Sequence, residues 1–207
     1  MIGVVAYGMG NIQSVCNAFD YLGHPVTVVE TPDDLNAVER IVLPGVGAFP
    51  SAMARLHDTG FARALDEQVR ERGKPVLGIC LGMQLLAEEG TEFRQCPGLG
   101  WIPGRIEIIE RETTGLRLPQ IGWNELAITG DSPLLAGLGN APCCYFVHSY
   151  HFRPRDPAHI EATVDYGGPV TAAVAHGNIF GVQFHPEKSQ KVGLKVLDNF
   201  ARLEMAR

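Results

Sequence analysis

Cys80 stands in a short motif that could hold a nucleophile. Residues 78–82 read G-x-C-x-G, the thiol counterpart of the G-x-S-x-G nucleophile elbow. A nucleophile on a sharp strand-to-helix turn has a strained backbone, and the glycines two residues away let the chain pass. The turn also sets the sulfur at a helix N-terminus, which favours thiolate over thiol. Alone, the motif fits a buried core cysteine equally well.

A cysteine nucleophile needs a base and a group that orients the base. Of the seven histidines, His185 follows a strongly apolar run and begins the sequence His185-Pro186-Glu187. Proline pushes the preceding residue into extended geometry, where residues i and i+2 project to the same side. We therefore expect Glu187 to lie beside His185 and to fix its tautomer. Alone this is also the pattern of a solvated turn, but beside the elbow a catalytic pair is favoured.

Acyl transfer also requires an oxyanion hole. In an elbow, the N–H of the residue after the nucleophile is one donor, which here is Leu81. A second glycine loop, Pro44-Gly45-Val46-Gly47, follows a predicted strand. A peptide between glycines can turn at low backbone cost, so the N–H of Val46 is the second predicted donor. A plain strand-to-helix turn would show the same residues.

The composition excludes several classes of function. The chain has 207 residues, 45% apolar and 19% charged, with a net charge of -6, which argues against binding to nucleic acid or an anionic membrane. No apolar run approaches a membrane span and no signal-like pattern opens the chain, so we expect the cytoplasm. Five cysteines without C-x-x-C spacing indicate free thiols and no metal site. The glycine loops lack complete nucleotide-binding motifs, so no cofactor is expected.

Buried strands alternate with helices in the first half of the chain. The predicted strands are 2–6, 26–29, 41–43 and 75–79, and the predicted helices are 11–22 with Asn11 as its cap, a short one from 31, one from about 51, 61–73 and 81–89. This alternation predicts an α/β fold with a mostly parallel sheet between helices. Ligands on such sheets bind at the carboxyl ends of strands, where both glycine loops and Cys80 fall.

The second half is richer in strands. A hairpin about Thr114-Gly115 is expected to join 105–109 to 116–126, followed by strands 144–152, 160–164, 170–174 and 179–184 and by a last helix over 189–205. The short spacing between these strands predicts antiparallel or mixed pairing. No linker or repeat interrupts the chain, so a single domain over 1–207 is expected.

These motifs resemble those of the class I (triad-type) glutamine amidotransferases. The elbow and His-Pro-Glu are shared by that whole class. From end to end, the chain more closely resembles the glutaminase subunits of imidazole glycerol phosphate synthase. The matching stretches are 7–11 (YGMGN), 44–49 (PGVGAF), 78–86 (GICLGMQLL), 121–124 (IGWN), 146–150 (FVHSY) and 184–189 (FHPEKS). The resemblance implies a flavodoxin-like fold.

The resemblance also implies a reaction and a set of roles. Cys80 would attack the side-chain amide of L-glutamine, His185 would carry the proton to the departing ammonia, and Glu187 would orient His185. Glutamate and ammonia would form through a thioester, without a cofactor. The residues implied to hold glutamine are Gly45, Gly47, Gln84, Ser149 and Tyr150. The residues implied to face a partner are Tyr7, Asn11, Trp123 and Lys188.

That implied partner is a cyclase subunit in a heterodimer, which would use the ammonia to form imidazole glycerol phosphate and an aminoimidazole carboxamide ribonucleotide in histidine biosynthesis. Two positions depart from the family pattern, with Ala6 where an acidic residue is common and Gln120 where histidine is common. Other possibilities are a glutaminase of another ammonia-channelling synthase, such as that of pyridoxal phosphate synthesis, and a catalytically dead interaction subunit. A thiol hydrolase is disfavoured because its acid would precede its histidine.

Overall fold

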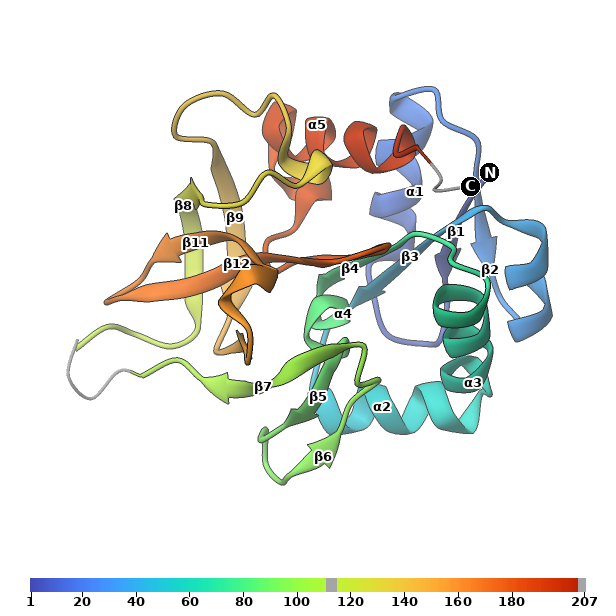
Figure 1. Ribbon diagram of the computed structural model, residues 1–207, viewed down its shortest axis with the longest axis horizontal. Helices are drawn as coiled ribbons and strands as arrows, with labels where there is room; N and C mark the ends of the chain where they lie inside the picture. The colour runs from blue at the N-terminus through green and yellow to red at the C-terminus, as the bar shows by residue number, and fades with distance from the viewer. Residues whose placement is uncertain (111–114, 205–207) are drawn as a thin grey trace.

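The computed structural model describes residues 1–110 and 115–204 and contains two sheets (Figure 1). Nine strands form the large sheet, in the order β2-β1-β3-β4-β13-β12-β11-β8-β9. Their bounds are β1 Ile2–Val5, β2 Val26–Val29, β3 Arg40–Gly45, β4 Val76–Cys80, β8 Gln120–Ile128, β9 Cys143–His148, β11 Ile160–Asp165, β12 Pro169–His176 and β13 Ile179–Val182. The first five strands in this order pair in parallel, and the others pair antiparallel. This mixed sheet with flanking helices confirms the predicted fold class.

Helices cover the parallel part of the sheet on both faces. Their bounds are α1 Ile12–Tyr21, α2 Phe49–Asp58, α3 Phe61–Asp66, α4 Leu81–Gln84 and α5 Gln190–Ala201, with shorter turns at Pro32–Ala37, Glu67–Glu71, Pro133–Leu135, Pro157–His159 and Pro186–Lys188. In Figure 1, α1 and α5 lie above the sheet and α2 and α3 lie below it. Strands of this part pack against the helices on both faces of the sheet, because their successive side chains point to opposite faces. Val42 of β3 packs in the core that contains Phe19 and Phe200, whereas Leu43 packs in the core that contains Leu56.

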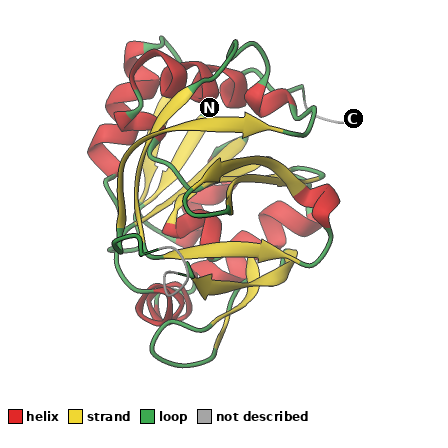
Figure 2. Ribbon diagram, turned by 90° about the vertical axis from the view of Figure 1, so that its left-hand side faces the viewer, coloured by secondary structure: helices red, strands yellow, loops and turns green. Residues whose placement is uncertain are grey.

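A smaller sheet forms a separate hydrogen-bonded unit and shares a hydrophobic core with the large one. It has four strands in the order β10-β7-β5-β6, with the bounds β5 Ala87–Gly90, β6 Cys96–Pro97, β7 Ile102–Ile108 and β10 Tyr150–Pro154. In Figure 2 it lies low in the molecule, far from the helices at the top. The single strand predicted over 144–152 is therefore wrong. The chain breaks at Ser149, so that β9 belongs to the large sheet and β10 to the small one.

Three further local predictions are corrected. Strands β7 and β8 were expected to form a hairpin, but β7 pairs with β10 and β5, and β8 pairs with β9 and β11; part of the predicted turn lies outside the described residues. The helix predicted over 81–89 is shorter in the structure. It ends at Gln84 as α4, because Ala87–Gly90 form β5 and pair with β7. Asn11 stands at the N-cap of α1, but its side chain makes no capping hydrogen bond.

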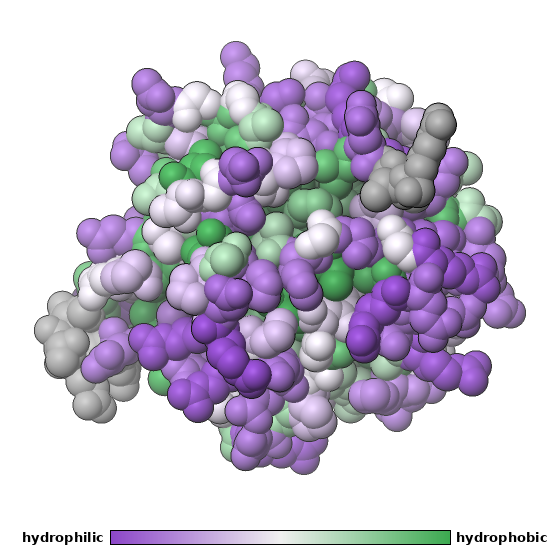
Figure 3. Space-filling model, viewed as in Figure 1, coloured by the Kyte–Doolittle hydropathy of each residue, from purple (hydrophilic) through white to green (hydrophobic). Residues whose placement is uncertain are grey.

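The face of the molecule in Figure 3 is largely hydrophilic. Hydrophilic residues cover most of the lower half of the face in Figure 3, and apolar residues reach the surface in scattered areas between polar ones. Within residues 1–110 and 115–204, none of the helices is long and apolar enough to cross a membrane. All five cysteines are free thiols.

Candidate active site

Cys80 occupies a strained turn between β4 and α4. Its backbone has φ 54° and ψ -111°, a conformation that L-residues rarely adopt and that persists only where the surrounding structure enforces it. The two flanking glycines are needed for close approach: a Cβ on Gly82 would overlap the carbonyl oxygen of Leu43, and one on Gly78 would overlap the carbonyl oxygen of Gly82. Because α4 has only four residues, it supplies no long helix dipole to the sulfur.

His185 and Glu187 form a buried pair beside this turn. The Nδ1 atom of His185 lies 2.8 Å from Oε1 of Glu187, and the two side chains are 3% and 1% exposed. The pair is close for a different reason than expected, because Pro186–Lys188 form a 3-10 turn rather than an extended chain. The hydroxyl of Ser189 donates to the carbonyl oxygen of His185 at 2.7 Å and secures this turn.

The pKa of His185 is raised to about 9 by its surroundings. Burial lowers the pKa most, but the nearby sulfur of Cys80 and the carboxylate of Glu187 together raise it by more. Since Nδ1 faces a carboxylate, it is the donor, and Nε2 is the nitrogen left for proton exchange. Among the described residues, Nε2 has no hydrogen-bond partner.

We expect the His185 ring to titrate near pH 9, and at a lower pH after Cys80→Ala, because that change removes a sulfur that favours the imidazolium while Glu187 remains. An NMR titration of the ring protons, assigned with His185→Asn, measures both midpoints. The pKa of His185 is higher in the folded than in the unfolded chain, so protonation of this ring stabilises the fold. That stabilisation is complete below pH 6.5 and is lost as pH rises through 9. A wild-type midpoint near 6.5 would contradict this.

A pocket of about 430 Å³ opens over Cys80 and His185. Its lining residues are Val46, Gly47, Cys80, Leu81, Gln84, Glu92, Pro119, Val147, His148, Ser149, Tyr150 and His185. The structure thus brings together the predicted nucleophile, the predicted base and six of the predicted oxyanion and substrate positions. Gly45, the remaining predicted position, does not line the pocket. A Cβ added to it would meet the hydroxyl of Tyr7 at 2.8 Å.

The sequence family described as glutamine amidotransferase class-I matches residues 4–203. The chain belongs to this family. Similar curated proteins include "Imidazole glycerol phosphate synthase subunit HisH" of Rhodospirillum rubrum, 44% identical with 97% of this chain and 98% of that protein covered. The protein of that name from Synechococcus sp. is 47% identical, with 96% and 92% covered.

Solved structures share the amidotransferase fold at lower identity. A crystal structure of a glutamine amidotransferase superposes with a TM-score of 0.75 at 21% identity and covers 96% of this chain and 98% of its own. The structure of PurLQS from Thermotoga maritima gives a TM-score of 0.74 at 21% identity, with 96% of both chains covered. At these identities the likeness concerns the fold.

Three residues at this amidotransferase site were not among the predicted site residues. Glu92 lines the pocket and accepts a hydrogen bond from the N–H of Phe49 at 2.7 Å. His148 also lines it; burial lowers its pKa to about 4, and its Nδ1 donates to the carbonyl oxygen of Tyr150 at 2.9 Å. Gln183 is fully buried, with Nε2 3.7 Å from the sulfur of Cys80. Of these, Gln183 alone stands near a predicted catalytic residue in the sequence, two residues before His185.

The residues expected to face a partner differ in exposure. Trp123 is 46% exposed and packs edge-on against Tyr145, and the ammonium of Lys188 lies 5.9 Å from the same ring. Asn11 is half-buried. Tyr7 is 1% exposed, so its assignment to the surface is wrong. It follows β1 two residues after buried Val5 and points to the same inner side.

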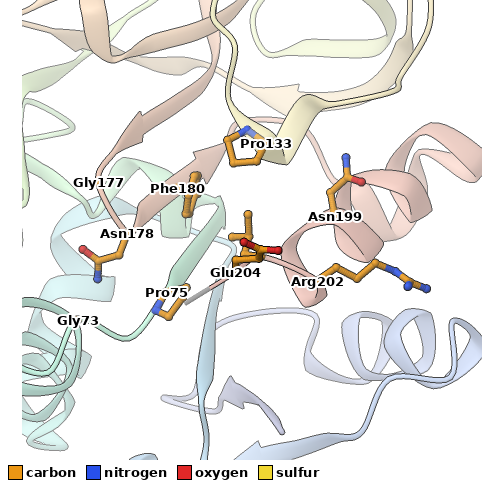
Figure 4. A pocket seen from close by; sticks show the side chains of 10 residues that line it. Gly73, Pro75, Pro133, Gly177, Asn178, Phe180, Asn199, Arg202 and Glu204 are labelled. Carbon is orange, nitrogen blue, oxygen red and sulfur yellow. The ribbon is translucent and has the colours of Figure 1, made fainter. Parts of the chain in front are cut away.

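A larger cavity, of about 550 Å³, lies at the opposite end of the sheet (Figure 4). Pro75 and Asn178 stand there at the amino ends of β4 and β13, away from the Cys80 edge. Its asparagines are already engaged, since the amide of Asn178 donates to the carbonyl oxygens of Val69 and Lys74, and that of Asn199 to the carbonyl oxygens of Leu134 and Ala136. No cysteine or histidine is among the described residues that line it, so this cavity offers no nucleophile for the family's chemistry.

Proposed function

We propose that this chain is the glutaminase subunit of an imidazole glycerol phosphate synthase and hydrolyses the side-chain amide of L-glutamine. The observation that carries the proposal is the convergence of Cys80, on its strained turn, with the buried His185–Glu187 pair at one pocket. A nucleophile, a base and a group that orients the base are the three parts that cysteine acyl transfer requires. The names of full-length relatives at 44–47% identity support the same subunit.

In the proposed reaction, the sulfur of Cys80 attacks the side-chain carbonyl carbon of glutamine while His185 holds the thiol proton. The N–H groups of Leu81 and Val46 stabilise the negative oxygen of the tetrahedral intermediate. Nε2 of His185 then gives the proton to the amide nitrogen, the C–N bond breaks and ammonia leaves a thioester on Cys80. Water, deprotonated by His185, cleaves the thioester and releases glutamate, so that glutamine and water yield glutamate and ammonia.

The pocket also contains groups suited to a free amino acid. Gln84, Gly47, Ser149 and Tyr150 offer amide and backbone groups for glutamine. Its α-ammonium requires a negative partner, and Glu92 is the carboxylate among the described lining residues.

We expect Glu92→Gln to raise KM for glutamine roughly 10- to 100-fold with a smaller change in kcat, because the substitution keeps an acceptor for the N–H of Phe49 but removes the charge. Steady-state kinetics of glutamate release measures both constants. Glu89→Gln is the matched control, since Glu89 bonds to Gln95 and does not line this pocket. A KM equal to that of wild type would exclude this role for Glu92.

The proposal includes a cyclase partner that receives the ammonia in a heterodimer in the cytoplasm. An aromatic and cationic cluster of Trp123, Tyr145 and Lys188 is a surface suited to such a partner. It is close to the site, because the carbonyl oxygen of Tyr145 accepts a hydrogen bond from the N–H of His185 at 3.0 Å. We assign no partner contact to Tyr7, because it is buried.

The decisive experiment measures glutamate release by this chain alone and with a histidine-pathway cyclase subunit and its phosphoribosyl ligand. Strong stimulation by the loaded partner is the expected result. Activity that the partner leaves unchanged would assign the chain to another ammonia-channelling synthase, such as that of pyridoxal phosphate synthesis. The absence of glutamate release under both conditions would indicate a dead interaction subunit.

A further inference from the structure

A chain of buried amides connects the small sheet to the nucleophile. Nε2 of Gln84, on α4, donates to the carbonyl oxygen of Tyr150 at 2.9 Å and to Oε1 of Gln183 at 3.0 Å. Nε2 of Gln183 in turn lies 3.7 Å from the sulfur of Cys80. The two glutamines are 5% and 0% exposed. Three segments far apart in sequence therefore meet in one hydrogen-bonded series that ends on the reacting sulfur.

The direction of each amide follows from the first acceptor. The carbonyl oxygen of Tyr150 can only accept, so the Gln84 group that faces it must be the NH₂ group. The second N–H of Gln84 then requires an acceptor, which fixes Oε1 of Gln183 toward Gln84. The opposite end of the Gln183 amide, which is its NH₂ group, must therefore face Cys80. A backbone carbonyl thus ensures that a donor, and not an acceptor, meets the sulfur.

We propose that Gln183 is a further catalytic residue, which donates a hydrogen bond to the Cys80 sulfur, holds it in place and stabilises its thiolate form. Gln84 acts one step behind it as a positioning residue. The catalytic role of Gln183 rests on the proposed glutaminase function, but its test does not require that function. A thiolate needs donors, and a donor inside the protein is worth more to a charged acceptor than to a neutral one. Gln183 approaches from the β13 side and makes no proton transfer.

The other groups that act on the sulfur have different effects. His185, on the loop after β13, attracts the thiolate when protonated, with Glu187 behind it. Tyr7, on the loop after β1, carries a buried hydroxyl without a hydrogen-bond partner among the described residues, and its pKa is raised by burial and by the charge of Cys80. Because His185 titrates and the amide does not, Gln183 supplies a stabilising contact that is constant with pH.

The test is the pH dependence of Cys80 alkylation by iodoacetamide, without glutamine, followed by peptide mapping to separate Cys80 from the other four thiols. In Gln183→Leu we expect the alkylation midpoint to shift upward by about one pH unit, which is a tenfold loss of thiolate below the midpoint. In Gln183→Glu the shift should be larger, since a carboxylate would face the sulfur. Gln84→Leu should move the midpoint in the same direction by less.

The matched control is Gln68→Leu. Gln68 is a buried amide, 3% exposed, that bonds to Asn36 away from the site, and its loss should leave the alkylation midpoint unchanged. If Gln183→Leu fails to fold, Gln84→Leu and Gln183→Asn carry the test, since both weaken the same bond. Folded Gln183 variants with the wild-type midpoint would overturn the proposal.

Kinetics separate this proposal from the function itself. In Gln183→Leu, kcat for glutamate release should fall roughly 10- to 100-fold with KM little changed, because the amide contacts the sulfur and not the ground-state substrate. If wild type releases no glutamate but the alkylation midpoints shift as expected, the glutaminase proposal fails and the role of Gln183 at the sulfur stands. If wild type is active and the variants have the wild-type alkylation midpoint, the glutaminase proposal stands and the role of Gln183 at the sulfur fails.

Discussion

Replacement of Cys80 by alanine is expected to abolish glutamine hydrolysis. The variant lacks the atom that forms the thioester, so kcat should fall by roughly 10⁴-fold or more. The fold should survive, because Cys80 is a small buried side chain and alanine removes only the sulfur. Glutamate release in a coupled assay measures the loss.

Added ammonia provides the control for this variant. With the cyclase partner and its ligand, Cys80→Ala should still support product formation from an ammonium salt, because its docking surface is intact. Cys16→Ala serves as the matched thiol variant, since Cys16 is a buried cysteine on α1 and its loss should leave glutamine use unchanged. Glutaminase activity that survives in Cys80→Ala would exclude Cys80 as the nucleophile.

Glu187→Gln is expected to give the second largest loss, roughly 10²- to 10⁴-fold in kcat with a modest change in KM. The neutral amide keeps the shape of the side chain but does not stabilise the imidazolium and can present an N–H to Nδ1, which selects the wrong tautomer. The 2.8 Å contact between two side chains that are nearly excluded from solvent makes this effect strong. Steady-state kinetics measures it.

The loss in Glu187→Gln should be smaller than in Cys80→Ala, because the nucleophile remains. Glu71→Gln is the control, since Glu71 is exposed in the turn that follows α3 and does not line the pocket over Cys80. A Glu187→Gln variant with the kcat of wild type would show that the carboxylate does not orient the base. A loss equal to that of Cys80→Ala would argue for a direct part in the chemistry.

The parallel half of the fold could be predicted from the sequence because its signals are local. Strand β2 spans the four predicted residues, 26–29, β3 contains the predicted run 41–43, and β4 is shifted by one residue from the predicted 75–79. The G-x-C-x-G spacing also predicts the strained turn, since a nucleophile there requires both close backbone approach and a positive φ. Such features are decided within a short stretch of chain.

The predictions that failed depend on distant partners. Ala87–Gly90 continues a helical pattern, but pairing with β7 makes it a strand. Nothing in the strand predicted over 144–152 marks Ser149 as the point where the chain passes from one sheet to the other. Glu92 and Gln183 gain their importance only because separate elements bring them to Cys80. Sequence patterns identified the reacting groups better than the groups that surround them.

The contact between Gly82 and the carbonyl of Leu43 has a consequence for how this site can be altered or transferred. The elbow and the strand that leads to the glycine loop touch backbone to backbone at this point, with no room for a Cβ. At this contact no side chain sets the spacing, so a Cβ at position 82 could be accommodated only by a shift of the backbone itself. The two segments form one indivisible module, which a chimera or a transplanted site must take from a single parent.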